Sequence, residues 1–461
     1  MQTQLAALGL SSLGRCEANT LAGLNAVLDV LRRLAGPAPA KRPLLPKPPV
    51  DFVSGPLRLE RHTRRLLGPR PAHRATHIMV TMPSEAANDA NLVEGLLRSG
   101  MDIMRINAAH DDATAWRAMV GHLKRARTAT GLRCKVLVDL AGPKLRTGAL
   151  ETEAGVLKIK PRRDRHGAAT APGRVWLTPA GGTPPPAAPG YAIVPVNGDL
   201  PPDITDVVVD DRRGKRRRLK VERTAGLSLL CATDRTIYVE SGSRLRFFAK
   251  RERRGRGQVG ALPATTQAIL LRSGDRLRLT RTAAAGRPAR RGRKGPEPAC
   301  IPCTLPQVFR DVRRGEPIWF DDGKIGGIVT SNDRRVIDVR ITRTRVGGAL
   351  LLPDKGINLP LSNLRLSGLT EKDRRDLAFA CRHADMVGLS FAQRPEDIQR
   401  LASLLHKGKK RPPGIVLKIE TRRGFDALPR LLLSALRTPP VGVMVARGDL
   451  AVEVGFERLA E

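Results

Sequence analysis

Three short stretches decide the fold of the first half of this chain: His77-Ile-Met-Val-Thr81, Asp102-Ile-Met-Arg-Ile-Asn107 and Lys135-Val-Leu-Val-Asp139. Each is an apolar run of strand length. Between them lie a helical stretch that ends at Ser99-Gly100 and a second from Ala113 to Ala129. Strand, helix, strand, helix, strand at this spacing predicts parallel βα units.

The pattern stops at Ala149 and stays absent until Leu352. This segment is rich in Pro, Gly and charge, and its apolar residues tend to alternate, as in Arg244-Leu-Arg-Phe247. Alternation predicts half-buried antiparallel strands. The arginine-rich runs from Arg212 to Arg218 and from Arg287 to Lys294 are expected to be solvated loops.

After Gly356 the βα pattern returns. Three helices are expected from Glu371 to Arg382, from about Pro395, and from Asp426 to Leu436. They alternate with strands at Asp385–Ser390, Gly414–Glu420 and Val441–Ala446. The predicted fold class is therefore α/β: an incomplete (β/α)8 TIM-type barrel of about six strands, interrupted by an inserted β-rich domain, because a closed barrel of this type has eight strands.

We expect four segments along the chain. Residues 1–75 form a helical N-terminal extension and a Pro/Arg-rich linker, and residues 76–148 form the first part of the barrel. Residues 149–352 form the inserted β-rich lid domain, and residues 353–461 the second, truncated part of the barrel. Leucines at helical spacing predict a helix up to about residue 35, with Gly36-Pro37 as its stop.

The charge raises the question of nucleic acid. The formal net charge is +37, and residues 149–352 hold 40 Lys and Arg against 20 Asp and Glu, so the excess runs through the whole chain. A nucleic-acid site usually concentrates charge on one face, so a general Arg-rich composition is the favoured interpretation. No run of 18 apolar residues and no signal peptide is present, so we expect a cytoplasmic protein without a membrane span.

Charged side chains stand where the predicted strands end. Arg105 and Asn107 end the second strand, and Asp139, followed by Arg146, ends the third. Lys418 and Glu420 end the fifth, and Arg447 and Asp449 follow the sixth. In a (β/α) barrel these ends build the active site. Cations facing paired carboxylates there suit phosphoryl transfer with Mg²⁺, although any single charged residue at a strand end is more often simply solvated or paired.

Seven motifs resemble those of the pyruvate kinase family and occur in that family's order. They are Met104-Arg-Ile-Asn-Ala-Ala-His110, Val138-Asp-Leu-Ala-Gly-Pro-Lys-Leu-Arg-Thr-Gly148, Phe320-Asp-Asp-Gly323, Lys355-Gly-Ile-Asn-Leu-Pro360, Leu369-Thr-Glu-Lys-Asp373, Leu417-Lys-Ile-Glu420 and Met444-Val-Ala-Arg-Gly-Asp-Leu450. The resemblance implies a barrel interrupted by a lid domain, and a glycolytic transferase that moves phosphate from phosphoenolpyruvate to ADP, giving pyruvate and ATP.

The resemblance also implies roles for individual residues. The catalytic residues would be Lys418 and Arg105, and substrate would also contact Arg447, Gly448 and Asp449. Glu420 and Asp449 would bind Mg²⁺. The nucleotide side would hold Asn107, His110 and Arg146, and Asn107 with Asp139 would mark the monovalent-cation position.

Some positions depart from the family pattern. Ala109 stands where potassium-dependent members place a serine, and Lys144 replaces the usual acidic residue. A fixed ammonium at Lys144 could substitute for the monovalent cation, so we expect that K⁺ is not required. The inserted domain is about twice the usual length. Two strands and the C-terminal domain of the family are not found before Glu461, which makes activity of this chain doubtful; a homo-oligomer stays possible.

Three functions therefore remain open. The first is a pyruvate kinase-type enzyme that uses phosphoenolpyruvate and ADP/ATP. The second is a non-catalytic relic or binding module that keeps the anion and metal contacts. The third, least favoured, is a nucleic-acid-binding protein that uses the inserted domain.

Overall fold

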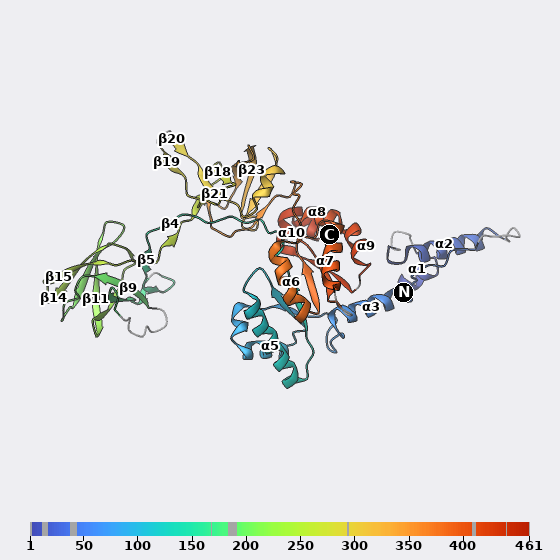
Figure 1. Ribbon diagram of the computed structural model, residues 1–461, viewed down its shortest axis with the longest axis horizontal. Coiled ribbons are helices and arrows are strands. Elements are labelled where there is room, and N and C mark those ends of the chain that lie inside the picture. The colour runs from blue at the N-terminus through green and yellow to red at the C-terminus, as the bar shows by residue number, and fades with distance from the viewer. Residues whose placement is uncertain are drawn as a thin grey trace. The chain divides into compact units, whose positions relative to one another are not determined.

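The computed structural model of the protein describes residues 2–11, 17–36, 44–166, 168–182, 191–292, 295–407, 412–438 and 440–460 (Figure 1). The chain divides into two compact units. The first comprises residues 1–145, 305–329 and 356–461, and the second comprises residues 146–304 and 330–355. None of the helices in the described ranges is long and apolar enough to cross a membrane.

The first unit is built on a six-stranded sheet of order β1-β2-β3-β27-β28-β29, in which every pair is parallel. We call this sheet and its helices the half-barrel. The strands are β1 (Met79–Thr81), β2 (Ile103–Asn107), β3 (Lys135–Asp139), β27 (Met386–Leu389), β28 (Gly414–Ile419) and β29 (Val441–Val445). Consecutive parallel strands need helical crossovers. The predicted six-stranded, interrupted TIM-type barrel is therefore confirmed.

The crossover helices are α4 (Ala90–Arg98), α5 (Ala113–Thr130), α6 (Glu371–His383), α7 (Pro395–His406), α8 (Arg422–Asp426) and α9 (Leu428–Ala435); α10 (Arg447–Val454) and α11 (Phe456–Ala460) follow β29. Local sequence explains several ends. Asp112 caps α5, whose C-cap is the left-handed Gly131, and Thr370 with Asp373 forms a capping box on α6. The single helix predicted from Asp426 to Leu436 is wrong at its start: the segment forms α8 and α9, joined at Ala427.

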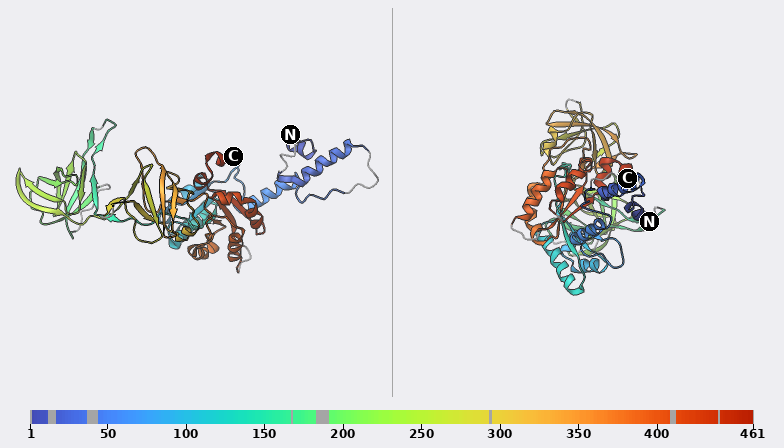
Figure 2. Two further views of the ribbon diagram at one scale, coloured as in Figure 1. Left: turned by 90° about the horizontal axis from the view of Figure 1, so that it is seen from above. Right: turned by 90° about the vertical axis from the view of Figure 1, so that its right-hand side faces the viewer.

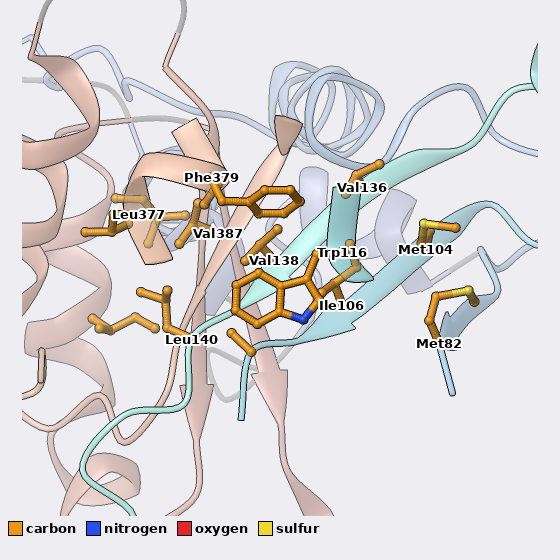
Figure 3. Packing of buried hydrophobic residues seen from close by; sticks show 14 of the residues in the cluster. Met82, Met104, Ile106, Trp116, Val136, Val138, Leu140, Leu377, Phe379 and Val387 are labelled. Carbon is orange, nitrogen blue, oxygen red and sulfur yellow. The ribbon is translucent and has the colours of Figure 1, made fainter. Parts of the chain in front are cut away.

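The core of the half-barrel lies between the sheet and its helices (Figure 3). Trp116 of α5 and Phe379 of α6 are both buried, with ring centroids 5.5 Å apart. They pack with strand residues such as Ile106, Val138 and Val387. Strands buried on both faces have nearly continuous apolar sequences. A polar side chain in such a sheet therefore lies at a strand end or pairs with another buried polar group.

A helix that precedes the first strand also belongs to this unit. The N-terminal segment forms α1 (Gln2–Ala7), the short 3₁₀ helix η2 (Glu17–Asn19), α2 (Thr20–Leu34) and α3 (Ser54–Leu67). The basic residues from Arg61 to Arg65 lie in α3. The Pro-rich stretch lies partly outside the described residues.

The end of α3 packs against the inner face of the sheet. Leu66 is 6% exposed and clusters with Ile103, Leu137, Met386 and Val416. A side chain at Gly414 or Gly442 would collide with Leu66, because an added Cβ would lie 2.6 or 2.7 Å from its methyl groups. Leu66 therefore fills space at the start of these strands.

The second unit is almost entirely β structure. Besides the strands of a closed barrel, it contains β4 (Thr152–Glu153), β5 (Val156–Ile159), β6 (Arg162–Arg163), β7 (Ala169–Ala171), β13 (Ile237–Glu240), β16 (Thr265–Thr266), β17 (Ile269–Leu271), β18 (Arg276–Thr280), β19 (Arg290–Gly292), β20 (Gly295–Glu297), β21 (Ala299–Pro302), β24 (Val336–Arg343) and β25 (Ala349–Leu351). The strands β22 (Pro317–Phe320) and β26 (Ile357–Asn358) and the 3₁₀ helices η3 (Ser84–Ala87) and η4 (Pro306–Arg310) belong to the first unit, and the division between units falls within β23 (Ile325–Asn332).

Seven of its strands close into a barrel, drawn in green in Figures 1 and 2. We call it the inserted barrel; its order is β10-β11-β12-β8-β9-β15-β14. The strands are β8 (Gly173–Pro179), β9 (Ala192–Asn197), β10 (Asp206–Asp210), β11 (Arg216–Ala225), β12 (Ser228–Thr233), β14 (Arg244–Ala249) and β15 (Glu252–Val259). Its interior is apolar, with Val207, Leu219 and Phe247 at 1% exposure or less. The expected loop from Arg212 to Arg218 is partly wrong, because Arg216 already begins β11.

Candidate functional site

Lys418 lies at the centre of a buried polar network at the carboxyl ends of the strands. Its ammonium Nζ is 2.6 Å from Glu420 Oε1 and 3.1 Å from Asp139 Oδ2, and it donates to Ser390 Oγ at 2.8 Å. Lys418 is 8% exposed, and its three partners are buried. Burial alone would lower the pKa of Lys418, but the Asp139 and Glu420 carboxylates outweigh it and hold that pKa above its usual value. The site thus keeps a fixed positive charge in a largely dry environment.

Arg105 joins the same network from β2. Its guanidinium pairs with Asp139 through Nη2 and through Nε, the latter at 3.0 Å, and Nη1 donates to Thr81 Oγ1 at 2.8 Å. Asp139 is completely buried, and the cations of Arg105 and Lys418 both pair with its carboxylate. The structure therefore brings Arg105, Asp139, Lys418 and Glu420 together.

Glu420 carries a buried carboxylate with a raised pKa. Burial raises its pKa; Lys418 opposes this shift, and the carboxylates of Asp449 and Asp139 reinforce it. Its Oε2 accepts a hydrogen bond from the Phe391 amide at 3.3 Å. A cation that replaced or joined Lys418 beside Glu420 would favour the ionised carboxylate.

Asp449 lies in the first turn of α10, directly after Arg447 and Gly448. Its Oδ1 is 3.4 Å from Lys144 Nζ, and both side chains are partly exposed. Arg447 and Gly448 are exposed, and an added Cβ at Gly448 would meet nothing within 4 Å. The backbone amides at the start of this eight-residue helix can donate hydrogen bonds to an anion. The open space at Gly448 leaves these amides accessible.

A cavity of about 60 Å³ lies beside this end of the network. Lys144, Phe391, Thr421 and Asp449 contribute to its wall. Of the charged residues described above, Lys144 and Asp449 border this space.

The remaining residues predicted from the sequence make other contacts. Asn107 Oδ1 accepts a hydrogen bond from the Ala109 amide at 3.2 Å, and Asn107 and His110 line a second pocket over β1 and β2. Arg146 belongs to the second unit, where its Nη1 is 2.8 Å from Asp354 Oδ2. The network does not include these three residues.

Two carboxylates near the network are candidate ligands for a divalent metal. Among the residues that the structure describes, no group of three or more Asp, Glu, His or Cys side chains is placed to hold a metal. Glu420 and Asp449 could contribute two carboxylates. Two carboxylates completed by substrate phosphate oxygens and water suit Mg²⁺, which rarely uses an all-protein cage, so the residues fit Mg²⁺ bound together with a phosphorylated substrate.

Sequence reasoning missed Ser390. It is 1% exposed, receives the Lys418 hydrogen bond, and donates to Asp139 Oδ1 at 3.4 Å. An added Cβ at neighbouring Gly388 would lie only 2.7 Å from Asp139 Oδ1, so this strand must approach the carboxylate closely. The signal was available, because Ser390 directly follows the fourth parallel strand, at the layer where the other site residues stand.

A second missed feature ties α10 to β26. Glu453 of α10 accepts a hydrogen bond from Asn358 Nδ2 at 3.0 Å and is 9% exposed. Burial raises the pKa of Glu453. Only the tertiary structure brings these two residues together, because they are 95 positions apart in the sequence.

The fold and the network define a class of protein: a (β/α)-barrel protein with a network of charged side chains at the carboxyl ends of its strands. The pyruvate kinase barrel domain model matches residues 73–164 and 259–461, more than half of the chain. The chain belongs to this family.

Individual relatives agree with the family match. A pyruvate kinase of Clostridium acetobutylicum is 33% identical over 153 residues, which cover 33% of this chain and 30% of that protein. One of Geobacillus stearothermophilus is 33% identical over 193 residues, which cover 42% and 30%. The alignments thus span less than a third of these relatives.

A solved structure supports the fold. The crystal structure of a pyruvate kinase from Cryptosporidium parvum is similar with a TM-score of 0.51 at 18% identity, over 86% of this chain and 56% of that one. This likeness concerns the architecture alone.

Proposed function

We propose that this chain carries a pyruvate kinase-type site, which transfers the phosphoryl group of phosphoenolpyruvate to ADP in the presence of Mg²⁺. The observation that carries the proposal is the Lys418 ammonium held by Glu420, Asp139 and Ser390 at 2.6, 3.1 and 2.8 Å. Family membership supports this reaction over other phosphoryl transfers.

In the proposed reaction the bond between phosphorus and the enol oxygen breaks, and a β-phosphate oxygen of ADP forms the new bond. The enolate left behind takes up one proton to give pyruvate. Lys418 and Arg105 offset negative charge on the moving phosphoryl group, and Lys418 also faces the developing enolate. Both cations are fixed in advance by Asp139, so little reorganisation is needed.

Other residues bind and orient. The amides at Arg447 and Gly448 receive the substrate carboxylate at the start of α10. Glu420 and Asp449 would hold Mg²⁺, which would neutralise negative charge on the substrate. Asn107, His110 and Arg146 remain proposed for the nucleotide side.

A coupled assay for pyruvate tests the proposal, with phosphoenolpyruvate, ADP and Mg²⁺ as reactants. We expect turnover that falls at least about 1,000-fold in Lys418→Met, because one preorganised charge contributes about 10²–10³ or more to such steps. Lys124→Met is the matched control, since Lys124 is exposed on α5. Asp449→Asn, at a partly exposed carboxylate, tests the site without removing the buried ammonium.

The assay also separates the alternatives. If calorimetry detects binding of phosphoenolpyruvate and Mg²⁺ but the assay detects no turnover, the chain is a non-catalytic binding module and not an enzyme. Absence of both binding and turnover would reject the proposed site altogether.

Lys144 leads to a second proposal, that the activity needs no K⁺. Its ammonium lies 3.4 Å from Asp449 Oδ1, so a positive charge is already present beside a proposed metal ligand. Turnover is expected to be unchanged when KCl replaces tetramethylammonium chloride at constant ionic strength. A steep rise with KCl would contradict this.

A further inference from the structure

The family model does not match most residues of the inserted barrel. The two matched stretches end at residue 164 and resume at residue 259, so residues 165–258, which hold nearly all of the seven strands, are unmatched. The residues of the proposed phosphoryl-transfer site all lie outside this barrel.

The excess of positive charge in the barrel segment lies in two adjacent hairpins. Residues 165–258 contain 18 Lys and Arg against nine Asp and Glu. Residues 206–225 (β10–β11) and 244–258 (β14–β15) hold 15 of these cations and five of these acids. The rest of the segment has three cations and four acids, so the whole positive excess belongs to these hairpins.

The strand register gathers this charge on one face. β10 pairs with both β11 and β14, and β14 pairs with β15, so the two hairpins are neighbours. Arg218, Val208, Arg246 and Arg256 stand opposite one another across the four strands. We call the outward side chains of these strands the cationic face: Arg216, Arg218, Lys220, Asp206, Val208, Asp210, Arg244, Arg246, Phe248, Arg253, Arg256 and Gln258.

Only part of this charge is neutralised. Asp206 pairs with Arg218 at 3.0 Å, and Asp210 pairs with Arg246 at 3.0 Å and with Arg216 at 4.0 Å. Lys220, Arg244, Arg253 and Arg256 are exposed and form no ion pair among the residues that the structure describes. Seven cations thus face two carboxylates, and four cations remain available to an outside anion.

The opposite half of the barrel is different. Leu230 of β12, Trp176 of β8 and Ile193 of β9 form the corresponding row across strands. The cationic face is therefore a local arrangement and does not merely repeat the composition of the chain.

The turn of the β14–β15 hairpin adds two more cations in an unusual conformation. Lys250 and Arg251 have φ of 47° and 76°, in the left-handed region that favours glycine or asparagine. Each such residue costs on the order of 1 kcal/mol. The turn therefore keeps long cationic side chains where stability alone would favour smaller residues.

We propose that the cationic face binds a single-stranded polynucleotide. Neighbouring strands lie about 4.8 Å apart, so the four strands form a strip about 15 Å wide, enough for one backbone. Arginine binds phosphate in a bidentate manner and stacks on bases. Half-buried Phe248, opposite Arg253, offers an aromatic surface within the strip. A membrane surface fits less well, because large apolar anchors are lacking among the face residues named above.

Fluorescence anisotropy of a labelled 20-nucleotide poly(U) strand with the full chain tests this proposal, without phosphoenolpyruvate or ADP, so that its outcome is independent of the proposed activity. The variant Arg244→Gln/Arg253→Gln/Arg256→Gln is expected to weaken binding at least about tenfold at 0.1 M salt. The slope of log K against log salt should become shallower by about 2, because three phosphate contacts are lost at about 0.7 each.

The matched control is Arg125→Gln/Arg430→Gln/Arg437→Gln, which removes the same charge at exposed arginines of the first unit. It should bind poly(U) within about twofold of the parent. Equal weakening in both variants, no binding at 0.1 M salt, tighter binding of a 20-base-pair duplex, or binding of phosphatidylserine vesicles but not of poly(U) would each overturn the proposal.

Phe248→Leu, which keeps all charges, is expected to weaken poly(U) binding several-fold, and unchanged binding would overturn the stacking contact.

Discussion

The half-barrel and the inserted barrel use charge in opposite ways. In the half-barrel the charged groups lie at strand ends and pair with one another: Asp139, Lys418 and Glu420 are buried, and Arg105 is half-buried. In the inserted barrel, cations alternate with apolar residues along antiparallel strands and face solvent. Parallel strands covered on both faces leave polar groups only at their ends, whereas antiparallel strands can leave one face wet. Strand topology therefore decides whether charge becomes a preorganised site or an open surface.

The largest difference should appear when one cation is removed from each region. Lys418→Met leaves Glu420 and Asp139 without their shared ammonium and is expected to destabilise the half-barrel by about 3 kcal/mol or more. Arg246→Ala removes a partly exposed pair and should cost less than about 1 kcal/mol. Urea unfolding monitored by amide exchange in β28 and β14 measures both. Equal costs would break the comparison.

Packing at the start of the half-barrel strands provides the next test. Leu66→Ala is expected to cost about 2–4 kcal/mol, because Leu66 is buried among Ile103, Leu137, Met386 and Val416. Leu57→Ala on the same helix should cost about 0–0.5 kcal/mol, since Leu57 is 56% exposed. Amide exchange in β2 and β27 reports the loss. Similar values for both variants would show that α3 does not support the sheet.

Asp211 is a buried charge of the inserted barrel and, like the charges of the half-barrel, is paired with a charge of opposite sign. Asp211 is 3% exposed, and its hydrogen bonds with Arg213 lower its pKa from 3.8 to about 2. A lowered folded-state pKa gives stability that is present above the unfolded pKa and is lost as pH falls from about 4 to about 2. Asp211→Asn is expected to remove about 2 kcal/mol at neutral pH and to flatten this acid dependence. Acid titration of the barrel, followed by amide exchange in β10 and β11, tests it; an unchanged acid midpoint would contradict the assignment.

The smallest effect is expected on the cationic face. Arg244→Gln/Arg253→Gln/Arg256→Gln should change the stability of the inserted barrel by no more than about 0.5 kcal/mol per residue, because none of the three arginines has an ion pair in the described part of the chain. Thermal unfolding measures this. A large loss would mean that these arginines support the fold rather than an interaction surface.

Much of the half-barrel could be predicted from the sequence. The strands around Arg105, Asp139 and Lys418 are apolar runs interrupted by charge at one end, and the parallel arrangement follows from the helices between them. The closeness of Ser390 to Lys418 followed from the same pattern and was overlooked. The pair of Asn358 and Glu453 carries no local signal, because a contact over 95 positions depends on the path of the whole chain.

By itself, the sequence determined the parallel βα order, the interruption after the third strand and the residues that end each strand, since these follow from local periodicity. Only the tertiary structure decided that α3 places Leu66 against the sheet, that Lys418 is shared by two carboxylates and Ser390, and that fifteen cations of residues 165–258 lie in two neighbouring hairpins. The physical reason is that periodicity records which face of an element is buried, whereas strand register and side-chain packing decide which buried or exposed faces meet.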